Sequence, residues 1–113
     1  KDLLDAFFMP WGVEFMTKND FPRIEIFRMH KEKIAKRGIF VDSGELSFVN
    51  STNVGLIGKT KATVTYYGPD ALNVLVVMKG AIANVVASGH AVIKIYNIGG
   101  EVNINADKTV KIL

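Results

Sequence analysis

The sequence predicts a mainly β protein, a β-solenoid in which strand-turn units of about ten residues stack on one another and N-terminal helices cap the stack. Three observations support this fold class. The C-terminal half repeats with a period of about ten residues, its units resemble one another, and the hydrophobic pattern changes from helical to β near Gly38.

The repeat is clearest in four consecutive units, which begin at Ala62, Ala71, Ala81 and Ala91 and are therefore offset by 9, 10 and 10 residues. Each unit is a β-prone run closed by a turn that contains glycine. The turn glycines are Gly68, Gly80, Gly89, Gly99 and Gly100. A fixed period of strand plus turn is typical of β-solenoids and of regular β-meanders.

The connections between the units favour the solenoid. Tight antiparallel hairpins prefer Asn-Gly or Asp-Gly, whereas the turns here read Gly-Pro-Asp, Lys-Gly, Ser-Gly-His and Gly-Gly. Each unit also opens with alanine, whose small side chain suits a bend. The alternative is an antiparallel β-sandwich, roll or jelly-roll-like barrel, which would share the same strand spacing.

The first residues predict a short amphipathic helix over residues 2–9, with leucine and phenylalanine on one side. We expect Pro10 to end this helix, because the residue before a proline is pushed out of the α region. Residues 11–16 then read as an extended segment.

A second helix is predicted from Pro22 to Arg37. Asp20 is its expected N-cap, Pro22 lies in its first turn, and Gly38 is its expected left-handed terminator. Its apolar stripe, which we expect to pack on the β half, consists of Ile24, Phe27, Ile34 and Ala35.

From Ile39 onward the pattern is β to the end of the chain, with further strands over residues 39–41, 45–49, 54–57, 102–105 and 110–113. No linker or composition break divides the sequence. We therefore expect a single domain over residues 1–113, with a helical part at 1–38 and a β-repeat region at 39–113.

Composition narrows the range of functions. The chain has 113 residues with 14 basic and 11 acidic side chains, and its net charge of +3 is too small to indicate specific nucleic-acid binding. The absence of cysteine excludes disulfides, thiolate zinc sites and cysteine nucleophiles.

No secretory signal is visible, and the apolar stretch at 71–87 contains Lys79, so we expect no membrane span. A soluble protein, cytoplasmic or virion-associated, is the expectation.

No residues are predicted as catalytic, cofactor-binding or metal-binding. Asp70, Ser88 and His90 would approach one another if turns two units apart stack, but no nucleophile elbow accompanies them, and they read as turn residues. The run Gly55–Thr60 resembles the end of a phosphate-binding loop but has the wrong glycine spacing and precedes a strand instead of a helix.

Apolar residues on both faces of several strands predict self-association, because soluble monomers rarely expose large apolar patches. A closed homo-oligomer is expected. The candidate interface residues are Val74, Val76, Ile82, Val86, Val92 and Ile112.

A second hypothesis is a small carbohydrate- or ligand-binding β-domain. Its candidate stacking platform consists of Tyr66, Tyr67 and Tyr96.

Four segments carry a resemblance: residues 18–22 (Lys-Asn-Asp-Phe-Pro), 38–42 (Gly-Ile-Phe-Val-Asp), 79–83 (Lys-Gly-Ala-Ile-Ala) and 87–92 (Ala-Ser-Gly-His-Ala-Val). The chain resembles small uncharacterised proteins associated with prophages and mobile elements of gut bacteria. The resemblance implies a phage-related structural β-protein and brings no activity with it. We therefore expect a non-enzymatic structural or interaction module, with a protein or glycan partner.

Overall fold

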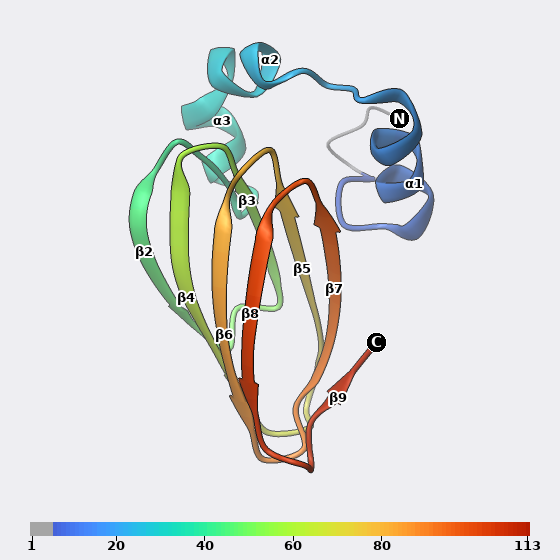
Figure 1. Cartoon of the computed structure of the whole chain (residues 1–113), viewed down its shortest axis with the longest axis vertical. Coiled ribbons are helices and arrows are strands. Elements are labelled where there is room, and N and C mark those ends of the chain that lie inside the picture. The colour runs from blue at the N-terminus through green and yellow to red at the C-terminus, as the bar shows by residue number, and fades with distance from the viewer. Residues whose placement is uncertain (1–5) are drawn as a thin grey trace.

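The strands of this protein wind into a β-solenoid of two parallel sheets (Figure 1). The fold is known from a computed structural model, which describes residues 6–113. Consecutive strands alternate between the sheets, so each strand pairs with the strand two further along the chain. Every pairing between the named strands is parallel.

Each sheet contains every second strand. The first sheet consists of β1 (Ile39–Val41), β3 (Asn53–Ile57), β5 (Leu72–Met78), β7 (Val92–Ile98) and β9 (Lys111–Ile112). The second sheet consists of β2 (Gly44–Val49), β4 (Thr60–Tyr67), β6 (Ile82–Ser88) and β8 (Glu101–Ala106).

The register shows how the repeat folds. Val64 pairs with Val85 and Val85 with Ile104, which are steps of 21 and 19 residues. One coil therefore contains two of the ten-residue units, which lie on opposite sheets, and units two apart stack directly. The predicted solenoid is confirmed, and the antiparallel alternative is wrong because all named strand pairs are parallel.

The interior between the sheets combines small and large side chains. The second sheet contributes small residues such as Ala83 together with the large Tyr66, and the first contributes residues such as Leu75 and Ile93, in one buried cluster. Small and large side chains together fill the space between the sheets.

The alanines that open the units have different roles. Ala81 and Ala91 are completely buried at the bends before β6 and β7, as expected for small residues at a turn. Ala62 instead lies within β4, and Ala71 is an exposed turn residue.

The helices α1 (Pro10–Asn19), α2 (Ile24–Met29) and α3 (Lys31–Ala35) lie at one end of the strands (Figure 1). They pack on the outer face of the first sheet and form a second core with it. Its buried members are Phe7, Val13, Met16, Phe27, Ile34, Ile39, Val41, Ile57, Val76 and Met78. The helical part therefore covers a side of the solenoid.

The first helix differs from the prediction. Pro10 begins α1 and does not end a helix, and residues 11–16 are helical, not extended. A proline at the first helical position is favourable because its missing N–H has no intrahelical partner there. Residues 6–9 form a turn, and the rest of the predicted 2–9 helix lies outside the described residues.

The second predicted helix is divided in two at His30, whose backbone (φ −112°, ψ 20°) leaves the helical region. Phe27 and Ile34 are buried as predicted, one on each short helix, and Gly38 adopts the expected left-handed conformation with φ 82°. Phe27 and Ile34 are seven residues apart, and both pack in the core cluster that the helical part forms with the first sheet.

Asp20 is not the N-cap of the second helix. It ends α1 in the left-handed region with φ 45°, and its carboxylate pairs with Lys79 at 2.8 Å. Pro22 precedes α2 and lies outside its first turn.

The burial of Phe27 predicts the cost of removing its ring. Phe27→Ala should lower the free energy of unfolding by roughly 3–5 kcal/mol, because the change removes buried apolar surface and leaves a cavity. Chemical denaturation measures this loss. Met29→Ala, on the same helix but 75% exposed, should change stability by less than about 0.5 kcal/mol. Equal effects of the two variants would contradict the packing described here.

Candidate functional site

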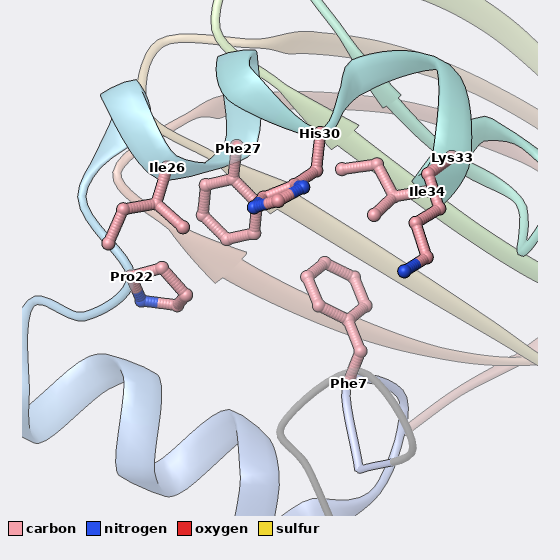
Figure 2. A pocket seen from close by; sticks show the side chains of 7 residues that line it. All are labelled: Phe7, Pro22, Ile26, Phe27, His30, Lys33 and Ile34. Carbon is pink, nitrogen blue, oxygen red and sulfur yellow. The ribbon is translucent and has the colours of Figure 1, made fainter.

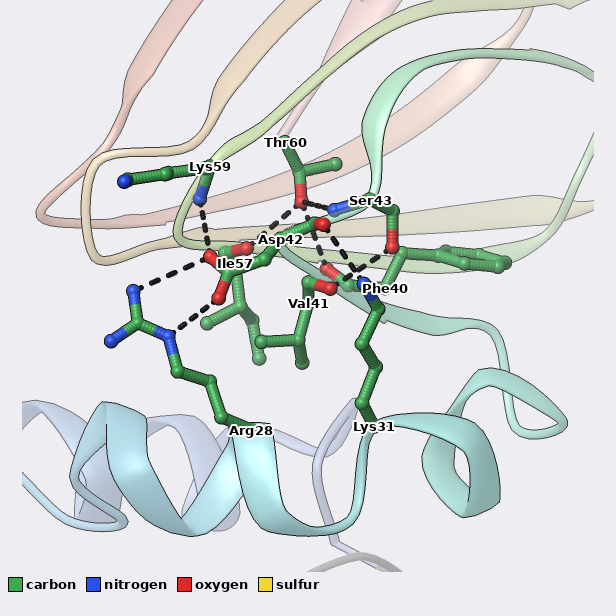
Figure 3. Close-up of polar contacts among 9 residues, drawn as sticks. All are labelled: Arg28, Lys31, Phe40, Val41, Asp42, Ser43, Ile57, Lys59 and Thr60. Atoms are coloured by element: carbon green, nitrogen blue, oxygen red, sulfur yellow. Dashed lines mark hydrogen bonds and ion pairs between the residues drawn. The ribbon is translucent and has the colours of Figure 1, made fainter.

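Asp42, in the turn between β1 and β2, connects the helices to the strands (Figure 3). Its carboxylate accepts hydrogen bonds from the Arg28 guanidinium of α2 and, at 2.8 Å, from the backbone N–H of Lys59. The Lys31 ammonium of α3 donates to the Asp42 carbonyl at 2.9 Å. One residue therefore joins two helices and the turn of the next coil.

The charge of Asp42 is stabilised where it lies. The hydrogen bond from Arg28, followed by that from the Lys59 backbone N–H, holds the pKa of the Asp42 carboxyl below its usual value. The same pairing raises the pKa of Arg28. Ion pairs between half-exposed groups such as these contribute only modestly to stability. We call the contacts of Asp42 with Arg28, Lys31 and Lys59 the clasp, because they connect the helices to the strands.

The run Gly55–Thr60 also has a structural role. A Cβ at Gly55 would lie 2.6 Å from the Phe7 ring, and Gly58 has φ 69°, which favours glycine. The buried Thr60 hydroxyl donates to the Ile57 carbonyl at 2.9 Å and accepts from the Ser43 N–H at 3.0 Å (Figure 3). The resemblance to a phosphate loop therefore reflects a close approach of Phe7 and a tight turn.

A cavity of about 230 Å³ lies between Phe7 and the helices α2 and α3 (Figure 2). Most of its wall is apolar, and His30 and Lys33 supply the polar groups. Its lining residues are Phe7, Pro22, Ile26, Phe27, His30, Lys33 and Ile34. An apolar enclosure with a few polar groups is the usual form of a small-molecule site.

Sequence reasoning missed this cavity because it needs the break at His30, where neither glycine nor proline marks a helix end. The cluster of lysines at 31–36 was a visible signal of positive charge beside it.

The last coil, which consists of β8 and β9, has two inward side chains that are exposed to solvent. Ile104 of β8 is 48% exposed and Ile112 of β9 is 40% exposed, although both occupy inward positions. Their stacking partners one coil earlier, Val85 and Ile93, are 1% and 0% exposed. The period of the repeat could have identified Ile104, since it continues the column of inward residues.

The predicted interface residues do not form one surface. Val74, Val76 and Val92 lie on the outer face of the first sheet, where Val76 is fully buried beneath the helical part. Ile82 and Val86 lie on the outer face of the second sheet. Ile112 belongs to the open last coil.

Val76 is therefore wrong as an interface residue of the folded chain. Side chains of the helical part, among them Phe7 and Met16, cover the face of the sheet that the sequence left without a partner.

The three tyrosines are not brought together either. Tyr66 points into the core and is fully buried, Tyr67 points outward from the second sheet, and Tyr96 packs partly buried on the outer face of the first. Adjacent strand residues point to opposite faces, so Tyr66 and Tyr67 cannot share a platform. Burial raises the pKa of the Tyr66 hydroxyl, which has no hydrogen-bond partner within residues 6–113.

The turns that follow β4 and β6 do stack, since a Cβ at Gly89 would lie 3.2 Å from the Gly68 nitrogen. Asp70 and His90 lie in these turns, and Ser88 is the last residue of β6. No hydrogen bond joins the three side chains. The His90 N–H donates to the Thr109 hydroxyl at 2.9 Å, a contact between successive turns.

Residues 6–113 contain neither a metal-binding cluster nor a membrane-spanning helix. No group of three or more His, Cys, Asp or Glu side chains there is arranged to hold a metal ion. None of the helices in that part of the chain has the length and hydrophobicity needed to cross a membrane.

Comparison with known proteins gave no relative: no protein-family model, no curated protein and no solved structure matches the chain significantly.

The clasp predicts a pH dependence. Because the folded-state pKa of Asp42 is lowered, its contribution to stability is present above the unfolded-state pKa of about 3.9 and is lost as the pH falls through the folded value. Asp42→Asn should therefore be less stable than the native chain at pH 7, and the difference should shrink below about pH 4. Thermal unfolding from pH 7 to 2.5 measures it. Asp70→Asn, at an exposed turn without an ion pair in the described chain, is the control, and a gap for Asp42→Asn that is constant with pH would refute the assignment.

Proposed function

We propose that this protein is a non-enzymatic interaction module that associates with a second copy of itself through its last coil. One observation carries the proposal. Ile104 and Ile112 lie in columns of inward side chains, yet they are 48% and 40% exposed. Covering them would bury apolar surface, at about 25 cal/mol per Å².

The backbone of the last coil supports the same conclusion. β8 is the final strand of the second sheet, with β6 as its only neighbour among the described strands. Its other edge presents N–H and C=O groups that a further strand can pair with. Addition of a strand at such an edge combines backbone hydrogen bonds with side-chain burial.

Charge disfavours head-to-tail stacking of copies. Along one row of the second sheet, Glu45 lies beside Lys61 and Ile82 beside Glu101. Continuing the parallel register into another copy would place Glu101 next to the Glu45 of that copy. Like charges directly opposite one another destabilise a sheet, so an open fibre is not the expected assembly.

A two-fold arrangement avoids this conflict. If two β8 strands pair antiparallel about an axis at Ile104, inward residues face inward residues, with Val102 opposite Ala106. The contact is closed, as in most homo-oligomers. The proposed assembly is therefore a dimer.

The resemblance to proteins of prophages and mobile elements supports a structural role in such an element. In that setting, a module that joins two copies end to end serves as a connector. This setting is tested by purifying the particle or complex that the neighbouring genes encode and searching for this chain in it by mass spectrometry.

Glycan binding is a second candidate, and a pocket of about 200 Å³ beside Tyr67 favours it. The pocket is lined by Asn50, Thr52, Tyr67, Gly68, Asp70, Ala71 and Asn73. An exposed aromatic ring next to carboxylate and hydroxyl groups suits a sugar, which offers an apolar face and hydroxyls. A glycan array should then show binding that Tyr67→Ala removes.

The dimer predicts a specific sensitivity at the last coil. Light scattering after size exclusion should give twice the chain mass for the native protein at tens of micromolar. Ile104→Lys should give the monomer mass, because it places a charge in the proposed apolar contact.

Val49→Lys is the matched control, since Val49 is 58% exposed at the opposite end of the second sheet. It should leave the dimer intact. A monomeric native protein, or equal dissociation by both variants, would refute the proposal.

A further inference from the structure

We propose that the cavity beneath α2 and α3 is a binding site for a small monocarboxylate with an apolar body, such as a medium-chain fatty acid. This site is separate from the last coil and does not depend on the association proposed above. The inference rests on the walls, the size and the charge of the cavity.

The walls suit an apolar body. Phe7 and Phe27 are 1% and 4% exposed, and Ile34 is 2% exposed, so the deep side of the cavity is built from core residues (Figure 2). Pro22 and Ile26 complete the apolar lining from the start of α2. Water in such a space finds few hydrogen-bond partners, so an alkyl or aromatic group displaces it favourably.

The size selects a small ligand. A volume of about 230 Å³ holds roughly seven or eight water-sized groups of about 30 Å³ each. This matches the seven-carbon tail of octanoate or the ring of a small aromatic acid. A long lipid chain or a folded peptide segment does not fit.

The charge selects an anion. His30 and Lys33 are exposed residues of the lining, and Figure 2 shows the Lys33 side chain extending from α3 toward the side of the cavity where Phe7 lies. Neither side chain makes an ion pair or a hydrogen bond with another residue of the described chain. A carboxylate held there would accept charge-assisted hydrogen bonds from both.

The neighbouring surface strengthens the positive potential and supplies a control. Arg28 and Lys36 line an adjoining hollow together with Met29, His30, Glu32 and Lys33. Arg28 forms an ion pair with Asp42. Lys36 lines this hollow but does not line the cavity. Lys33 is thus the lysine whose position specifically matches the proposed carboxylate.

The test is titration of the native protein with octanoate, followed by ¹H–¹⁵N correlation spectra and by the melting temperature. Shifts should concentrate at Phe7 and in residues 22–34, and the melting temperature should rise with ligand concentration, as expected for binding to the folded state. 1-Octanol, which has the same tail without the charge, should bind at least about tenfold more weakly if a charge-assisted hydrogen bond is lost.

Two pairs of variants make the assignment specific. Lys33→Gln should weaken octanoate binding by about tenfold, whereas Lys36→Gln should leave it within about twofold. Ile26→Trp should fill the cavity and abolish the shifts, and Met29→Trp on the exposed side of α2 should not. The melting temperatures of the unliganded variants show that each one is folded.

Several results would overturn the proposal. One is the absence of saturable shifts at about 5 mM octanoate, since a Kd of that size corresponds to a binding free energy of about −3 kcal/mol. The others are shifts located mainly outside Phe7 and residues 22–34, and equal binding of octanol and octanoate. Equal weakening by Lys33→Gln and Lys36→Gln would show a diffuse charge effect and would also refute the site.

Discussion

The in-register parallel pairing of strands two units apart is the constraint on which the structure depends. It places each inward side chain directly between its counterparts in the coils before and after, as Val85 lies between Val64 and Ile104. The inward side chains of a coil in the middle of the stack are therefore buried by the neighbouring coils. Among the described strands, the coil formed by β8 and β9 has one neighbouring coil, which is why Ile104 is exposed although its pattern is that of a core residue.

The helical part solves a different problem, the apolar outer face of the first sheet. Phe7 packs so closely on this face that a Cβ at position 55 would lie 2.6 Å from its ring, and Asp42 fixes α2 and α3 to the turns of the first two coils. Because α2 and α3 are short and separated at His30, they reach the sheet through single large residues. The space that remains between these residues is the cavity proposed as a carboxylate site.

The β-solenoid could be predicted from the sequence because each ten-residue unit with its glycine turn corresponds to half of one coil. Local rules were ambiguous elsewhere. Pro10 is compatible with ending or beginning a helix, and only the burial of Val13 and Met16 selects the second role. Strands that are apolar on both sides do not reveal which side faces inward, so the pattern alone does not show that Val76 and Tyr66 are both buried. The cavity needs tertiary contacts between Phe7 and two helices, which no local pattern encodes.

The two-fold contact at Ile104 is tested most directly by a single cysteine. The chain contains no cysteine, so Ile104→Cys provides one thiol per copy, and residues directly opposite in an antiparallel pair have Cα atoms about 4.5–5.5 Å apart, within disulfide range. Mild oxidation of Ile104→Cys should give a disulfide-linked dimer at protein concentrations where Val49→Cys stays monomeric. Failure of Ile104→Cys to cross-link, or equal cross-linking of both variants, would contradict a dimer formed through the last coil.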